Sequence, residues 1–153
     1  MSSELSQQEA DRLRGLPKEF LDLSPLILTD HFDIDRGLRS TDKQELFILT
    51  LRQGRIDIKK VTYNKRHNSG ITLVRVDITK GQHTNPDGEK IIGPHIHIYK
   101  EGYGDAIAIP LPNNHLGFNT VDDHLKCLDD FFKFCNIQPV KVVNQRSLIN
   151  LGV

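Results

Sequence analysis

The chain has 153 residues, and its 20 Lys+Arg are balanced by 20 Asp+Glu, so its formal net charge is zero. This length predicts one domain with its own core, covering residues 1–153. The charge balance argues against a protein that coats nucleic acid through bulk electrostatics, and it leaves a local basic patch open. No apolar run is long enough to span a membrane and the N-terminus does not resemble a signal peptide, so we expect a cytoplasmic protein without a membrane partner.

Residues 1–24 are predicted to form a helical N-terminal extension. Ser6 and Glu9 have the spacing of a capping box, which marks a helix start. The helix should pause near Gly15, because Pro17 fits poorly inside a helix but well at the first position of the next turn.

Residues 31–110 are predicted to form an antiparallel β-meander. Apolar and polar residues alternate through most of this region, which is the two-residue period of a half-buried strand. The polar segment 52–55 is typical of a tight hairpin turn, and residues 79–91 form a longer connection. The expected strands are 32–38, 45–51, 56–63, 71–78, 92–99 and 105–110.

A C-terminal helix is predicted over residues 120–136, with Thr120 as its N-cap. Cys127 and Cys135 both fall in this helix, too far apart for a disulfide within it, so we expect reduced packing residues. Residues 139–153 should hold a short strand or a tail. The fold class is therefore α+β: an antiparallel meander of about six strands, with N- and C-terminal helices packed on one face.

Three of the seven histidines fall within residues 83–97. His95, His97 and Tyr99 alternate with two isoleucines, so the polar side chains should share one strand face while the isoleucines point into the core. We expect Val74, Val76, Ile96 and Ile98 to be buried beneath the C-terminal helix. If strands 71–78 and 92–99 pair, the opposite face brings the polar side chains of both strands together.

That opposite face predicts a phosphodiester site. The histidine pair on the second strand would act as general acid and base on a ribose-phosphate bond, and Arg75 would stabilise charge on the phosphate. Asp77 would hold one imidazole in its working tautomer, and Tyr99 would help to orient the phosphate. A polar, solvated sheet face without function is the alternative interpretation. The candidate catalytic residues are His95, His97, Tyr99, His83 and Asp77, and the candidate substrate-binding residues are Arg75, Lys59 and Lys60.

The same residues allow a metal site, although the acid–base hypothesis needs no cofactor. His95 and His97 could bind a divalent ion on one face, with Glu101, His83 or Asp77 completing the ligand set. The sequence has no phosphate-binding glycine loop, nucleophile elbow, zinc-type cysteine pair or dinucleotide fingerprint. These absences argue against kinases, nucleotide hydrolases, serine hydrolases and dehydrogenases.

Several motifs resemble a small bacterial and prophage family without assigned function. They are Leu73-Val-Arg-Val-Asp77, His83-Thr-Asn-Pro-Asp-Gly88, Gly93-x-His95-x-His97-Ile-Tyr99-x-Glu101-Gly-Tyr-Gly-Asp105 and Phe131-Phe-x-x-Cys-x-Ile137, within residues 40–140. More faintly, the order of Arg75, Asp77, His83, His95 and His97 is similar to TumE-type toxins of toxin–antitoxin pairs. That resemblance implies a ribonuclease toxin, with RNA as substrate and a cognate antitoxin as partner.

A second hypothesis is a non-enzymatic prophage inhibitor or accessory protein that docks on a host protein. The small size and the zero net charge are compatible with it. An enzyme should fail when single histidines are removed, whereas a docking surface should fail at exposed aromatic residues such as Tyr103.

Overall fold

The computed structural model describes residues 4–63, 68–121 and 123–145. Within this part of the chain, two α-helices and one short 3-10 turn (η1) accompany eleven strands. The elements in chain order are α1 (Gln7–Gly15), β1 (Lys18–Phe20), β2 (Leu26–Leu28), β3 (Asp33–Ser40), β4 (Leu46–Arg52), β5 (Arg55–Tyr63), β6 (Asn68–Asp77), β7 (Gln82–Thr84), β8 (Lys90–Ile92), β9 (His95–Ile98), β10 (Ala108–Pro110), η1 (Asn114–Leu116), α2 (His124–Phe134) and β11 (Val142–Asn144).

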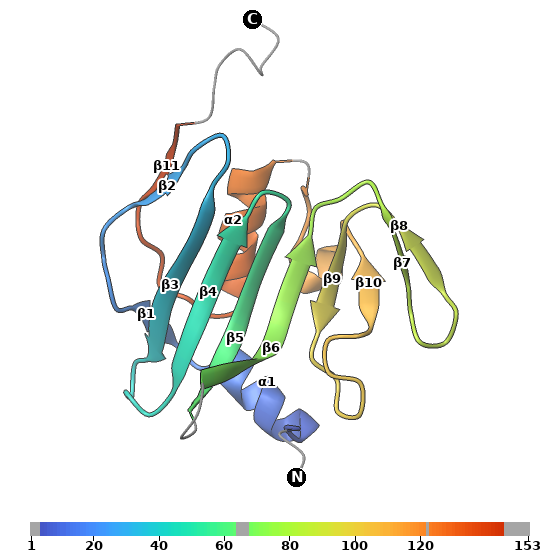
Figure 1. Cartoon of the computed structure of the whole chain (residues 1–153), viewed down its shortest axis with the longest axis horizontal. Coiled ribbons are helices and arrows are strands. Elements are labelled where there is room, and N and C mark those ends of the chain that lie inside the picture. The colour runs from blue at the N-terminus through green and yellow to red at the C-terminus, as the bar shows by residue number, and fades with distance from the viewer. Residues whose placement is uncertain (1–3, 64–67, 122, 146–153) are drawn as a thin grey trace, which may run out of the picture.

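Seven strands form one antiparallel sheet in the order β1-β3-β4-β5-β6-β9-β10 (Figure 1). Two further pairs stand outside it, a parallel pair of β11 with β2 and an antiparallel hairpin of β7 with β8. The α+β class and the meander are thus found, but the predicted strand count of about six is wrong. The missed strands have only three residues each, too few for a two-residue period to be visible.

Both helix starts depend on side-chain caps. The Ser6 hydroxyl accepts a hydrogen bond from the Glu9 amide at 3.1 Å, as the capping box predicts, and α1 ends at Gly15. Helical structure does not resume after this point, because the chain enters β1 of the main sheet. The cap of α2 is Asp123 and not Thr120, since the Asp123 carboxylate accepts from the Leu125 amide at 2.9 Å.

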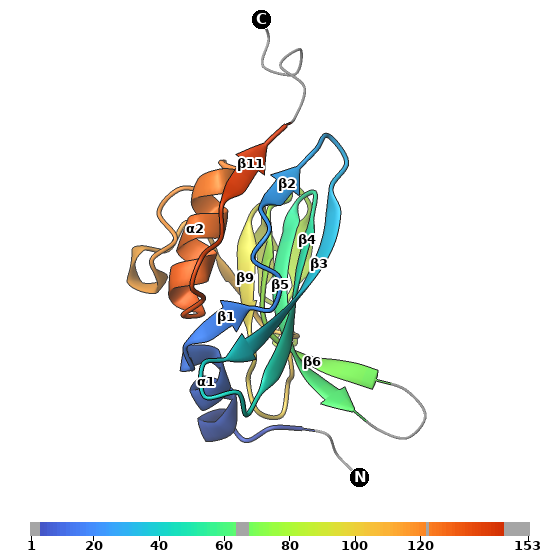
Figure 2. The ribbon, with the colours of Figure 1, turned by 90° about the vertical axis from the view of Figure 1, so that its left-hand side faces the viewer.

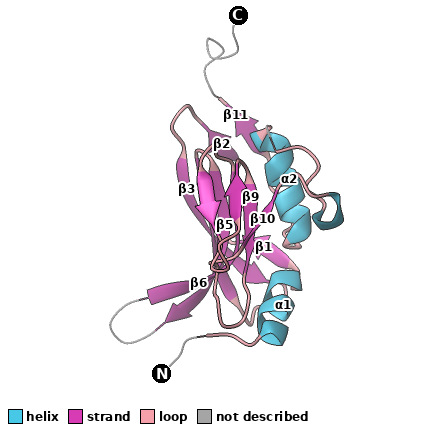
Figure 3. Cartoon of the chain, turned by 90° about the vertical axis from the view of Figure 1, so that its right-hand side faces the viewer, coloured by secondary structure: helices cyan, strands magenta, loops and turns pink. Residues whose placement is uncertain are grey.

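Helix α2 lies along one face of the sheet (Figures 2 and 3). Its Phe132 ring meets Phe20 edge-to-face at 5.9 Å between centroids. Val74, Val76 and Ile96 are fully buried in this core, as predicted, whereas Ile98 is only partly buried. The predicted packing of both helices on the face needs correction, because α1 lies at the end of the sheet where β6 begins (Figure 1).

The C-terminal ends of both helices meet at the buried Lys18. Its ammonium donates hydrogen bonds to the carbonyls of Arg14, Leu16 and Cys135 at 2.6, 2.9 and 2.8 Å. Burial lowers the pKa of Lys18 to about 8. Burial likewise raises the pKa of the Cys135 thiol to about 12, and both cysteines are free and buried, as expected of packing residues.

Candidate functional site

The face of the sheet opposite α2 carries two rows of polar side chains. Residues directly opposite one another on antiparallel strands point to the same side, so the strand register defines each row. One row is Asp33, Arg52, Arg55, Asp77 and His95, from β3 to β9. The other row is Asp35, Thr50, Asp57, Arg75 and His97. The predicted pairing of Arg75 and Asp77 with the two histidines is therefore confirmed.

Asp77 is the centre of this polar cluster. Its Oδ2 lies 3.1 Å from His95 Nε2 and 3.4 Å from His97 Nε2. Arg75 Nε donates to the same oxygen at 3.2 Å, and Arg55 Nε donates to Oδ1 at 3.3 Å. Burial alone would raise the pKa of Asp77, but the hydrogen bond with His97 and the charges of Arg75 and Arg55 outweigh it. The pKa of Asp77 therefore lies well below its ordinary value, and the carboxylate is ionised at neutral pH.

Arg75 is fully engaged by its neighbours. Besides Asp77, its guanidinium contacts Asp105 Oδ2 at 3.1 Å and His97 Nε2 at 2.9 Å. A cation with three partners of this kind is held in place by them. Arg75 is thus built into the cluster rather than presented to solvent, although the sequence suggested a phosphate-binding role.

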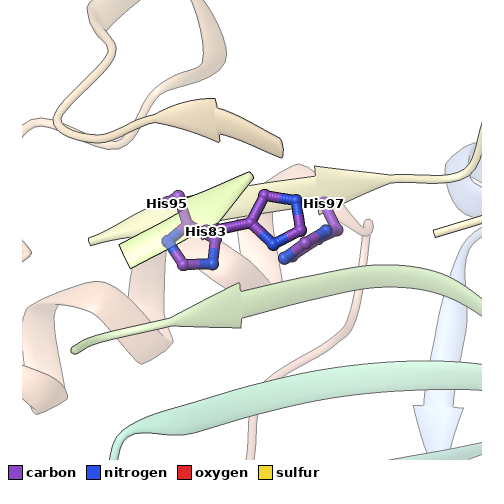
Figure 4. A group of neighbouring side chains, drawn as sticks. All are labelled: His83, His95 and His97. Atoms are coloured by element: carbon purple, nitrogen blue, oxygen red, sulfur yellow. The ribbon is translucent and has the colours of Figure 1, made fainter. Parts of the chain in front are cut away.

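The hairpin β7–β8 carries the third histidine, and His83 packs against the other two (Figure 4). Its ring centroid lies 5.4 Å from His95 and 4.8 Å from His97. Asn85 fastens the hairpin to the sheet edge, because its amide group bonds both the amide and the carbonyl of Ala108, at 2.8 and 3.0 Å. The residues 79–91, expected as a connection, thus form a hairpin that places His83 in the cluster.

The two strand histidines are buried. Only 4% of His95 and 0% of His97 is exposed, which does not fit the alternative interpretation of a solvated sheet face. Both side chains lie on the face opposite α2. They are covered by polar neighbours, namely His83 and the Arg75–Asp77 pair. The isoleucine between them packs in the core, as the alternation requires.

Hydrogen-bond partners indicate where the ring protons lie. His95 Nδ1 is 2.9 Å from the Gly93 carbonyl and its Nε2 faces Asp77, so both partners of this ring are acceptors. His97 Nε2 faces both a donor, the Arg75 guanidinium at 2.9 Å, and an acceptor, Asp77 Oδ2 at 3.4 Å. Its Nδ1 is buried with no hydrogen-bond partner among the described residues. A buried polar nitrogen left in this way is costly unless something binds it.

An open hollow of about 450 Å³ borders the cluster. His83, His95, Asp77 and Arg55 line it, together with residues of the β4–β5 turn and of the segment after β6. His83 is partly exposed, and its Nε2 lies 3.0 Å from the Ala106 carbonyl. A small polar ligand in this hollow could therefore reach Arg55, Asp77 and His95 of the first row and His83 of the hairpin.

Tyr99 and Glu101 are not part of the cluster. The Tyr99 hydroxyl accepts from the Leu5 amide at 2.8 Å and donates to the Leu5 carbonyl at 3.0 Å. Glu101 exchanges hydrogen bonds with Gln7, whose amide donates to its carboxylate at 2.7 Å. Both side chains thus hold the N-terminal segment. The structure brings His83, and not Glu101, to the two strand histidines.

The two predicted lysines lie apart from the hollow. Lys59 Nζ is 4.0 Å from Asp57 Oδ1, and Lys60 Nζ is 3.8 Å from Glu45 Oε1. The basic residues at 65–67, which follow these lysines in the sequence and could have formed a basic patch with them, lie outside the described residues.

Sequence reasoning missed Arg55 as a site residue. It was assigned to the turn after β4, but it pairs with Asp77 in register and lines the hollow. The signal was available in the spacing, because a two-residue turn at 53–54 makes Arg55 the first residue of β5. Pairing β5 with β6 then sets Arg55 beside Asp77.

Fold and site together define an α+β protein with a buried histidine–carboxylate–arginine cluster beside an open hollow. The chain belongs to a family of unknown function, DUF6978, whose profile matches residues 5–137. This agrees with the resemblance to a family without assigned function. No curated protein and no solved structure matches the chain. Neither helix of the described part of the chain has the length and apolar character needed to cross a bilayer.

Proposed function

We propose that the protein cleaves RNA phosphodiester bonds by general acid–base catalysis in the hollow beside His83 and His95. The observation that carries this proposal is that both imidazoles border the hollow together with the ionised Asp77 and the Arg55 guanidinium. Two imidazoles, one carboxylate and one cation are the groups that phosphodiester cleavage needs.

The roles follow from what each group contacts. His83 accepts the proton of the ribose 2′-hydroxyl, and the 2′-oxygen attacks phosphorus. The bond from phosphorus to the 5′-oxygen breaks, and His95 gives that oxygen its Nε2 proton, which Asp77 holds before the substrate binds. The products are a 2′,3′-cyclic phosphate and a free 5′-hydroxyl, so no metal or water is consumed in this step. Asp77 holds His95, and the partly exposed Arg55 contacts the phosphate.

This assignment shifts the acid–base pair from His95 and His97 to His83 and His95. His97 is fully buried and does not line the hollow, so it acts here as a positioning residue through Asp77. Arg55 takes the phosphate role in place of Arg75, which is held by its three partners.

Purified protein and a short labelled RNA test the proposal. Wild-type protein should cleave the RNA, and H83A and H95A should each lower the rate by about 100-fold or more. The matched control is H115A, which removes an exposed histidine of η1. Circular dichroism of each variant confirms folding. Intact RNA with the wild-type protein, or equal cleavage by H83A and H115A, would refute the mechanism.

We also propose that this activity belongs to a toxin of a toxin–antitoxin pair or a prophage, acting in the cytoplasm where its RNA substrate lies. The order of Arg75, Asp77, His83, His95 and His97, which is similar to TumE-type toxins, supports this. Expression from a tight promoter should arrest growth for the wild type but not for H95A, and co-purification from the host should capture an antitoxin. Equal growth of both strains would contradict it.

Docking on a host or prophage protein without catalysis is the second candidate function. The observation that favours it is a second hollow of about 500 Å³ beside the hairpin, lined by Tyr103, Ile107, Ile109 and Pro86. Half of the Tyr103 side chain is exposed there. In this case Y103A, and not H83A, should lose the partner in co-purification.

A further inference from the structure

We propose that His83, His95 and His97 bind one divalent transition-metal ion of the zinc class. One ligand atom from each of the three side chains can be chosen so that all three lie within 4.8 Å of one another. Imidazole nitrogen is a preferred ligand of Zn²⁺, Co²⁺, Ni²⁺ and Cu²⁺. This inference concerns binding alone and stands whether or not the protein cleaves RNA.

The buried Nδ1 of His97 is an independent observation that points to a ligand. The ring is fully buried, and this nitrogen has no hydrogen-bond partner in the described part of the chain. The His83 ring lies nearly perpendicular to the His97 ring, with 4.8 Å between the ring centroids (Figure 4). A metal ion held by these two rings would give the unpaired nitrogen a partner, whereas apolar neighbours would not.

The surrounding groups can orient two of the ligands. The Gly93 carbonyl accepts from His95 Nδ1 at 2.9 Å, the kind of contact that commonly fixes a metal-bound imidazole. When His97 binds through Nδ1, its ring proton lies on Nε2, where Asp77 Oδ2, 3.4 Å away, accepts it. Arg75 then gives up its contact with that nitrogen and keeps Asp105 and Asp77.

The hairpin supplies the movement that the site requires. Ligand nitrogens around tetrahedral zinc are about 3.3 Å apart, so the rings must approach more closely than 4.8 Å. His83 is the only partly exposed member of the three, and it stands on a three-residue strand outside the main sheet. Metal binding should therefore draw β7–β8 onto β9.

The consequence for the proposed function is competition. A metal ion occupies the nitrogen lone pairs that acid–base catalysis needs on His83 and His95. Metal would then inhibit RNA cleavage, and a chelator would restore it. This consequence rests on the proposed function, whereas metal binding itself is measured without RNA.

The experiment uses the untagged chain of residues 1–153 and Co²⁺ or Zn²⁺ alone. We expect one equivalent of Co²⁺ to give the intense visible bands of a tetrahedral site, and Zn²⁺ to displace it. H83A should weaken the affinity more than tenfold, D77N by about 10–100-fold, and H115A should leave it unchanged. His83 is partly exposed on the hairpin, so we expect H83A to fold even if H97A does not.

Hydrogen exchange gives a second readout. Zn²⁺ should slow amide exchange in residues 82–92 of the wild type, because the ion ties the hairpin to the sheet. Equal Co²⁺ affinity for wild type and H83A, or unchanged exchange at saturating Zn²⁺, would overturn the proposal. When the RNA-cleavage assay is repeated with a chelator present, its result does not depend on metal binding, so the two proposals can fail separately.

Discussion

Asp77 and Asp33 provide a matched pair for testing the polar cluster. Both belong to the same row and both pair with an arginine on the neighbouring strand, Asp33 with Arg52 at 3.0 Å and Asp77 with Arg55 at 3.3 Å. They differ in burial, because 66% of the Asp33 side chain is exposed against 15% for Asp77. The substitutions D77N and D33N therefore remove the same charge from two different environments.

The expected magnitudes differ several-fold. Breaking a buried pair leaves an uncompensated charge and costs about 3–5 kcal/mol, whereas an exposed pair is worth about 0–1 kcal/mol. Asparagine at 77 also turns an amide donor toward Arg55, Arg75 and His95, where the carboxylate accepted hydrogen bonds. D77N should thus lose about 3–5 kcal/mol of unfolding free energy at pH 7, and D33N less than about 1 kcal/mol.

The contribution of Asp77 to the unfolding free energy should depend on pH, and the direction of its pKa shift gives the sign. The pKa of Asp77 lies below its ordinary value of 3.8 in the folded state, so the unfolded chain binds the proton more readily. Its contribution is complete above about pH 4 and is lost as the pH falls further. Urea unfolding of wild type, D77N and D33N at pH 7 and at pH 2.5 measures both effects. Equal losses for the two variants at pH 7, or a D77N loss that stays constant down to pH 2.5, would refute the reasoning.

Three further outcomes are expected. D57N should raise the urea midpoint at pH 7 but not below about pH 4, because burial raises the pKa of Asp57 and its Oδ1 finds no hydrogen bond among described groups. Y99F should cost about 1–3 kcal/mol and speed hydrogen exchange near Leu5, since two hydrogen bonds to that residue are lost. I96A should cost about 2–5 kcal/mol in urea unfolding, because the side chain is fully buried in the core; a loss under 1 kcal/mol would contradict the assigned face.

The facing of the site strands could be predicted from sequence because β6 and β9 each keep a strict alternation. Val74 and Val76 on one strand, and Ile96 on the other, can be buried together only when they share one face of the sheet. That facing places Arg75, Asp77, His95 and His97 on the opposite face, where the observed register sets Arg75 opposite His97 and Asp77 opposite His95. The face on which the polar side chains meet is therefore set by apolar residues that take no part in the polar cluster.

The burial of the histidines could not be predicted in the same way. It depends on a hairpin whose strands have three residues each. It also depends on Asn85, whose side chain hydrogen-bonds the backbone of Ala108 as a neighbouring strand would. These contacts link residues 23 apart in the sequence, and no local period reports them. The same limit hid β1, because three residues after Pro17 carry no pattern that distinguishes a strand from a helix turn.

The string from His95 to Glu101 looks like one motif in the sequence, but the end of β9 at Ile98 divides it. Before this point the polar side chains face Asp77; beyond it, Tyr99 and Glu101 bind Leu5 and Gln7. The strand β9 thus carries the histidine cluster, and the residues that directly follow it hold the N-terminal segment. A substitution at Tyr99 that changed RNA cleavage would act by moving β9, since the phenol hydroxyl is already bonded to the Leu5 backbone. It should therefore lower Co²⁺ affinity as well, whereas loss of a chemical group at the phosphate would leave metal binding intact.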